Sequence, residues 1–68
     1  MYGNILAEAA RKGITMQRMA EHLGIHRNTF QNKIDGASVF TWSEAYSLQL
    51  EFFPELNITY LFAKIQVA

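Results

Sequence analysis

The sequence predicts an all-α fold, a compact bundle of five short helices. Gly13, Gly24, Gly36 and Pro54 divide the chain into segments of helical length. Within these segments apolar residues recur at helical spacing, and Thr or Asn stands where a helix N-terminus would be capped. Only the terminal Ile65-Gln66-Val67 has any strand character.

The first two helices are expected on either side of Gly13. The first runs from about residue 4 to residue 12, where Asn4 can cap the start and basic residues suit the negative end of the helix dipole. Gly13 supplies a left-handed stop. The second follows Thr15, a capping residue, and ends at Gly24. Its apolar stripe has the spacing i, i+3, i+4 and i+7: Met16, Met19, Ala20 and Leu23.

A third helix is expected from Arg27 to about Asp35. Only Ile25 and His26 separate it from Gly24, so the second and third helices must cross steeply.

The stretch Thr41-Trp42-Ser43-Glu44 has the spacing of a capping box and predicts a fourth helix that Pro54 ends. Its core stripe is Ala45, Leu48 and Phe52. A second apolar stripe either packs beneath the last helix or lies exposed and is covered in a twofold dimer; we expect a homodimer. That second stripe consists of Trp42, Tyr46, Leu50 and Phe53. Asn57 can cap a final short helix that carries Ile58, Leu61 and Phe62.

Composition indicates one small packed domain, because half of the 68 residues are hydrophobic and only 18% are charged. The absence of cysteine excludes a disulfide framework and a thiolate zinc site. The first residues have no basic leader, and no apolar run approaches the length of a membrane span. A cytoplasmic location without a membrane partner is therefore expected.

The formal net charge is zero, but the charges are divided unevenly along the chain. Residues 1–34 hold five basic and two acidic side chains, a balance of +3, whereas residues 35–68 hold one basic and four acidic, a balance of −3. Such a division is typical of a nucleic-acid-binding face on a neutral domain. Because the charged residues are few, a chance distribution along the chain explains this uneven division equally well.

The third helix has the polar face that a DNA-reading helix requires. At about 100° per residue, Phe30 and Ile34 share one face, and Asn28 and Asn32 lie opposite. Asn and Gln pair with adenine edges and Arg pairs with guanine. An ordinary solvated surface is the alternative, although Asn and Thr are poor helix formers. We expect base contacts from Arg27, Asn28, Gln31 and Asn32, and DNA-backbone contacts from Thr15, Gln17, Arg18, His26, Thr29 and Lys33.

Residues 14–36, ITMQRMAEHLGIHRNTFQNKIDG, resemble the helix-turn-helix of phage Cro and repressor proteins and of the related xenobiotic-response-element-type regulators. The matching features are Thr15 at the start of the first motif helix, Ala20 at the crossing, the turn Leu23-Gly24-Ile25 and a polar helix closed by Asp35-Gly36. FTWSEA and the two helices after it continue the likeness, so residues 1–68 are expected to be a single domain with its motif at about 15–35.

The resemblance implies a lambda repressor-like fold and a sequence-specific regulator of transcription that binds double-stranded DNA. It also implies a phage or mobile-element origin, a bacterial host cell and association with the nucleoid when bound. Arg27, Asn28 and Asn32 match the positions that most often touch bases in this family. Two departures are Met16, where the family usually has Gln, and Ile34, which takes the anchoring position one residue late.

Other classes of function fit less well. A protein-interaction module, such as an antirepressor or adaptor that keeps the fold without DNA binding, is the main alternative. His22 and His26 have the i, i+4 spacing of metal ligands, but Gly24 breaks the helix that would align them. No Ser/His/Asp constellation, phosphate-binding glycine loop or carboxylate pair stands out. We therefore expect no enzyme activity, no cofactor, no metal and no small-molecule ligand.

Overall fold

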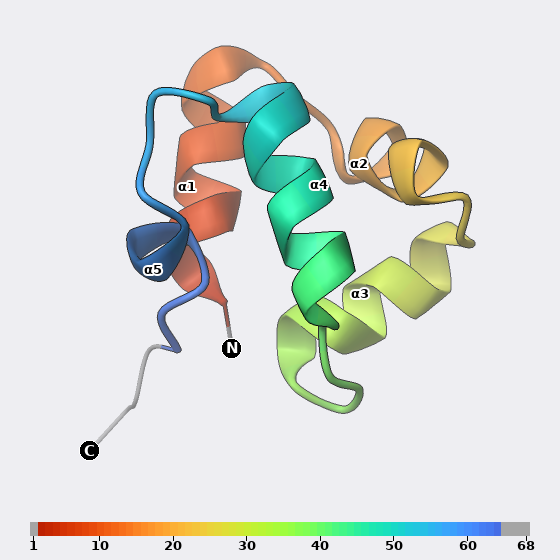
Figure 1. The fold of residues 1–68 in the computed structure, drawn as a ribbon. Coiled ribbons are helices and arrows are strands. Elements are labelled where there is room, and N and C mark those ends of the chain that lie inside the picture. Colours follow the sequence, from red (N-terminus) through yellow and green to blue (C-terminus); the bar gives the residue numbers. More distant parts are fainter. Residues whose placement is uncertain (1, 65–68) are drawn as a thin grey trace.

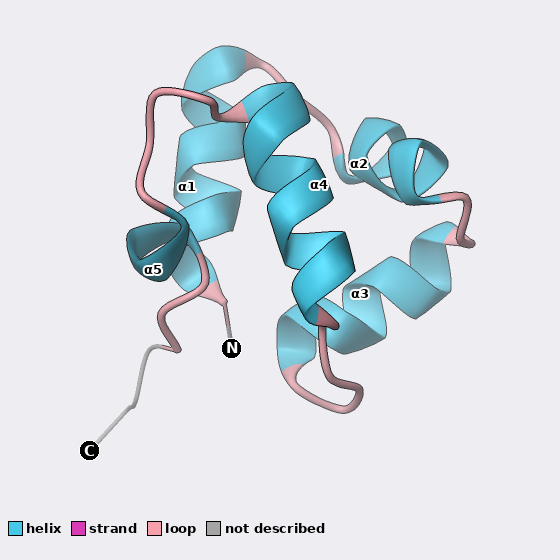
Figure 2. Ribbon diagram, in the orientation of Figure 1, coloured by secondary structure: helices cyan, strands magenta, loops and turns pink. Residues whose placement is uncertain are grey.

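The computed structural model describes residues 2–64, which form five helices and, within that range, no strand (Figures 1 and 2). The helices are α1 (Gly3–Lys12), α2 (Met16–Leu23), α3 (Arg27–Asp35), α4 (Trp42–Phe52) and α5 (Ile58–Leu61). The all-α prediction is confirmed, and the third helix has the expected bounds. Strand character at Ile65-Gln66-Val67 lies outside the described residues. None of the helices in residues 2–64 has the length and apolar character needed to cross a membrane.

The helices pack around α4, which contacts α2 on one side and α5 on the other (Figure 1). α1 packs against α5, and α2 packs against α3. The radius of gyration of 11.0 Å equals the value of about 11 Å that a compact chain of this length should have. The α2–α3 pair therefore forms one flank of a compact bundle.

The core joins segments from the beginning, middle and end of the described chain. Phe40 lies at the centre of an aromatic cluster, with its ring centroid 5.3 Å from that of Tyr2, 5.8 Å from that of Phe30 and 5.2 Å from that of Phe62. All three pairs have the edge-to-face geometry that aromatic rings prefer. The largest of the fully buried side chains are Ile5, Met19, Phe30, Ile34, Leu48, Phe53 and Leu61.

Four of the helices begin at a residue whose side chain caps the first turn. Three of these caps, at Thr15, Thr41 and Asn57, were predicted from the sequence. Thr15 accepts a hydrogen bond from the Arg18 amide, and the Asn57 side chain accepts from the Thr59 amide. Thr41 and Glu44 form both hydrogen bonds of the capping box. These contacts satisfy amide groups that the first turn of a helix leaves without partners.

The expected cap at Asn4 is wrong. α1 begins earlier, at Gly3, because the Tyr2 amide donates to the carbonyl of Ile34 at 3.0 Å and fixes the entry of the chain. Asn4 lies inside the helix, and its side-chain amide donates to the Tyr60 carbonyl at 2.8 Å. Asn4 therefore links α1 to α5 instead of capping α1.

The apolar stripes of α2 and α4 are largely confirmed, with one error. Met19, Ala20, Ala45 and Leu48 are buried, and Met16, Leu23 and Phe52 pack against the core from partly buried positions.

The error is Phe53, which was expected on the second stripe of α4 and is instead fully buried. Phe53 follows the last helical residue, with φ −137° and ψ 51°, so the 100° spacing no longer applies to its side chain. Its ring turns into the core, and the Lys12 ammonium lies 5.3 Å from the ring centroid. The remaining members, Trp42, Tyr46 and Leu50, are 69%, 47% and 53% exposed, so they are not packed away beneath α5.

Candidate nucleic-acid interface

The connection between α2 and α3 is a tight turn built on Gly24. Its φ of 70° lies in the left-handed region, and the amides of Gly24 and Ile25 donate back to the carbonyls of Glu21 and Ala20, each at 3.1 Å. Figure 2 shows how short this loop is beside the one between α4 and α5. Ala20 is 1% exposed, and its small side chain permits close packing where α2 meets α3. The turn therefore fixes the direction in which α3 leaves α2.

His26 caps α3 through its ring. Its Nδ1 accepts a hydrogen bond from the Asn28 amide at 3.2 Å. In the neutral ring one nitrogen accepts and the other donates, so a ring whose Nδ1 accepts carries its proton on Nε2. His26 is exposed, and it therefore offers an N–H donor beside the positive end of the α3 dipole. This arrangement suits a phosphate oxygen.

The outer face of α3 has no side-chain hydrogen bond or ion pair to residues 2–64, whereas its inner face is anchored. Phe30 and Ile34 are fully buried. Asn28 and Asn32 are exposed on the opposite side, and Arg27 is exposed in the first turn. The side chains of these three residues make no hydrogen bond or ion pair with residues 2–64. Thr29 is also exposed. The structure thus brings together three of the four expected base-contacting residues with their donors and acceptors available.

Gln31, the fourth, is partly buried and is held by a neighbour on the same helix. Its side-chain amide donates to the Asp35 carboxylate at 3.0 Å, one turn further on. A base edge would have to replace that hydrogen bond. Asp35 also places a negative charge at the end of α3, where it repels phosphate groups.

Lys33 does not present the free charge that a phosphate contact needs. Its side chain is only 12% exposed, and its ammonium lies 3.1 Å from the Glu44 carboxylate and 3.0 Å from the Val39 carbonyl. The ammonium also lies 5.9 Å from the centroid of the Phe40 ring. Lys33 therefore joins α3 to the start of α4, and the expectation that it contacts DNA is not supported by its position.

The expected contacts from α2 divide between two sides of that helix. The Arg18 guanidinium lies over the Phe52 ring, 5.7 Å from its centroid, in a hollow that Glu21 and Glu51 also line. Arg18 thus leans toward the end of α4. Gln17 is exposed, and the Thr15 hydroxyl is used as a cap but keeps its own proton to donate.

The basic character of residues 1–34 does not become a basic face. Three of the five basic side chains have acidic partners: Arg11 contacts Glu8, Lys12 contacts Glu55 and Lys33 contacts Glu44. Among residues 2–64 only Arg18 and Arg27 of that half have no ion-pair partner. Any phosphate binding at α2 and α3 must therefore rely largely on neutral donors and helix N-termini.

The structure also brings together a serine, a histidine and a glutamate from two different helices. His22 Nε2 lies 2.8 Å from the Ser47 hydroxyl, and His22 Nδ1 lies 3.7 Å from the Glu51 carboxylate. Ser47 and Glu51 are one turn apart on α4, but His22 comes from α2, and no sequence spacing predicts that meeting. Ser47 lies in the middle of α4, where backbone amides are used in helical hydrogen bonds and are not available to an oxyanion. The trio links α2 to α4.

The two histidines are directed to different partners. His22 contacts α4, whereas His26 caps α3. Among the described residues no group of three or more His, Cys, Asp or Glu side chains is placed to hold a metal ion.

Comparisons of the chain with protein-family models, with curated proteins and with solved structures found no match.

Proposed function

We propose that this protein is a sequence-specific double-stranded DNA-binding regulator of transcription, a Cro- or repressor-like protein of phage or mobile-element type. In this proposal α2 and α3 act as a lambda repressor-like helix-turn-helix, and α3 enters the major groove of an operator. The observation that carries the proposal is the two-sided character of α3. Phe30 and Ile34 anchor one face, while Asn28 and Asn32 on the other face and Arg27 in the first turn present unpaired polar groups.

Base reading is assigned to the residues at and after the first turn of α3. The Arg27 guanidinium has the fork of donors that matches guanine O6 and N7. The amides of Asn28 and Asn32 each donate and accept, as the N7 and N6 groups of adenine require. Gln31 reads a base only after it releases Asp35, so we assign it a smaller share of the specificity.

Backbone positioning is assigned mainly to neutral donors. The His26 Nε2–H, the Thr29 hydroxyl and the free amides of the first turn of α3 surround one helix N-terminus. Gln17 and the Thr15 hydroxyl flank the N-terminus of α2. With Arg18 and Arg27 as the unpaired cations, we expect about two phosphates to be neutralised per copy, and hence a slope of log affinity against log salt of about −2.

The test is fluorescence anisotropy with a pool of random duplexes at about 50 and 200 mM salt, followed by selection of an operator from the bound fraction. On that operator, Arg27→Ala and Asn28→Ala should each cost about 1–3 kcal/mol and relax the base preference at one position. Arg11→Ala is the matched control, because it removes the same charge from α1, where the side chain is 76% exposed.

Equal losses on operator and random DNA would reassign Arg27 and Asn28 to phosphate contacts. Absence of binding at both salt concentrations would overturn the regulator proposal.

A protein-interaction module is the second candidate, and the internal pairing of Arg11, Lys12 and Lys33 favours it. A domain with few free cations is a poor polyelectrolyte ligand. A stoichiometric complex with a defined heterologous protein, together with no retention on DNA, would support this candidate over the regulator.

A further inference from the structure

The outward face of α4 carries an apolar stripe that residues 2–64 leave about half exposed. Trp42, Tyr46 and Leu50 lie at i, i+4 and i+8, and they are 69%, 47% and 53% exposed. The rings of Trp42 and Tyr46 stack, with centroids 6.0 Å apart and planes inclined by 18°. We refer to these three residues as the α4 stripe. Its exposure costs free energy that burial against a second surface would recover.

We propose that the α4 stripe is the interface of a twofold homodimer in which two copies of α4 pack antiparallel. Tyr46, the middle residue, then lies near the twofold axis opposite its own copy. Trp42 of each protomer lies opposite Leu50 of the other. Because the stripe is a row of residues four apart, two such rows can interdigitate at a crossing angle of about −50°.

The charges around the α4 stripe favour a second protomer as the partner that covers it. The stripe itself has no charged member, and the acidic Glu44 beside it is already paired with Lys33. The nearest charge without a Lys or Arg partner is Glu51, which follows Leu50, contacts the His22 ring and is half exposed. A face of this kind is complementary to itself, since an apolar row meets an apolar row without burying a charge.

The same charges select the antiparallel orientation. In that orientation the Glu51 carboxylate lies close to the N-terminus of the other α4, the positive end of its dipole. In a parallel pair the two Glu51 carboxylates and two like helix ends would approach each other. The antiparallel pair avoids both repulsions.

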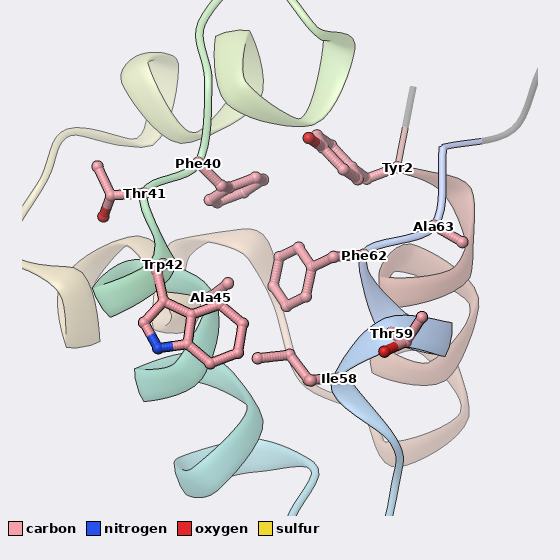
Figure 3. Close-up of a pocket in the computed structure, with 9 residues that line it drawn as sticks. All are labelled: Tyr2, Phe40, Thr41, Trp42, Ala45, Ile58, Thr59, Phe62 and Ala63. Carbon is pink, nitrogen blue, oxygen red and sulfur yellow. The ribbon is translucent and has the colours of Figure 1, made fainter.

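A hollow next to the α4 stripe adds a concave surface to the proposed interface. The hollow has a volume of about 430 Å³ and lies between the start of α4 and α5, where Trp42, Phe40, Ile58 and Phe62 line it. Figure 3 shows the Trp42 indole at its edge, facing the side chain of Ile58. In the antiparallel pair Leu50 of the second copy approaches Trp42 and gains this apolar border as a packing surface.

The area indicates a reversible dimer. From their exposed fractions the three side chains present about 400 Å² per copy, or about 800 Å² for two copies. Specific interfaces begin near 1,000 Å² in total, so the flanking residues must supply the remainder. We therefore expect dissociation in the micromolar range.

The dimer does not depend on DNA, whereas one consequence of it rests on the proposed function. If α3 reads DNA, two protomers related by a twofold axis read an inverted repeat. The tests of the dimer are therefore made without DNA, so that failure of the dimer and failure of DNA binding are separate results.

The first test is sedimentation equilibrium of the protein from about 5 to 500 µM, a range that populates both monomer and dimer. Tyr46→Glu places like charges near the axis and should weaken dimerisation about 100-fold or more. Ala7→Glu adds the same charge at an exposed position of α1 and should leave the monomer–dimer equilibrium unchanged. Circular dichroism checks that both variants remain helical.

The second test measures the register by charge exchange. Trp42→Glu and Leu50→Lys should each prevent self-association. An equimolar mixture should form a heterodimer, because in the antiparallel pair each introduced acid faces an introduced base across the interface.

Each result decides the proposal. Dimerisation lost in Tyr46→Glu and restored in the mixture supports it. A wild-type protein that remains monomeric at about 500 µM overturns it and leaves the stripe to a different partner. Dimers that survive Tyr46→Glu, or a mixture that stays monomeric, overturn the assigned surface or its antiparallel register.

Discussion

One carboxylate oxygen of Glu44 accepts from both the Lys33 ammonium, at 3.1 Å, and the Thr41 amide, at 2.9 Å. The first contact belongs to α3 and the second to the cap of α4. A single oxygen therefore ties the helix proposed to read DNA to the beginning of the next helix. Loss of this charge should loosen both.

Glu44 should make stability depend on pH in the acid range. Burial raises its pKa, but the hydrogen bonds from Thr41 and Lys33 and the Lys33 charge outweigh burial and hold the pKa below 4.5. Because the folded pKa lies below the unfolded one, the contribution is complete above about pH 4.5 and is lost as the pH falls through the folded pKa. Glu44→Gln should cost about 1–2 kcal/mol at pH 7.

Urea unfolding at pH 7 and pH 3 measures this effect. The difference between wild type and Glu44→Gln should shrink at pH 3, whereas Glu21→Gln, at an exposed position of α2, should change little at either pH. A Glu44→Gln cost that is the same at both pH values would show that its carboxylate charge contributes nothing.

The His26 cap should be measurable as stability. His26→Ala removes the acceptor of the Asn28 amide and should cost about 1 kcal/mol, whereas His26→Asn supplies a good capping acceptor and should recover most of that loss. Thermal unfolding of the three proteins checks the order. Equal melting temperatures would mean that water replaces the ring nitrogen without cost.

Phe53 and Leu50 provide a test of which face of α4 is buried near its end. Phe53→Ala should cost about 3–5 kcal/mol because it empties a fully buried site. Leu50→Ala, three residues earlier and half exposed, should cost less than about 1 kcal/mol in dilute monomeric protein. Similar losses for the two variants would contradict the burial described for Phe53.

Asp35 should weaken the proposed DNA contact. Asp35→Asn removes a negative charge from the end of α3 and should raise affinity for DNA several-fold at low salt, with little change in stability. The gain should fade as salt is added. Glu55→Gln, which removes the same charge from a half-exposed side chain between α4 and α5, is the control for overall charge. An equal gain in DNA affinity for both variants would show that the effect depends only on net charge.

Local signals predicted most of the fold. The caps at Thr15, Thr41 and Asn57 and the helix of residues 27–35 depend on residues within one turn of each other, so the sequence contains them. Phe53 was misplaced because helical spacing was continued one residue past the end of α4, where the backbone leaves the helix.

The candidate site was predictable only in part, for a physical reason. Asn28 and Asn32 are exposed because their own helix directs them away from Phe30, and Arg27 is exposed at the first position of that helix. Lys33 and His22 are engaged by Glu44 and by Ser47, residues of another helix that only tertiary packing brings near. Charge counts along the sequence missed these pairings, and the net charge of residues 1–34 therefore overstated the basic surface.

The aromatic cluster around Phe40 determines how cooperatively the domain unfolds. Tyr2, Phe30 and Phe62 reach it from opposite ends and from the middle of the described chain, so no subset of helices keeps a core when one ring leaves. Unfolding should therefore be all-or-none, and the slowest amide protons of α1, α3 and α4 should exchange with one shared free energy of opening. The pair α2–α3 is not an autonomous unit, and a peptide of residues 14–36 alone would be largely unstructured.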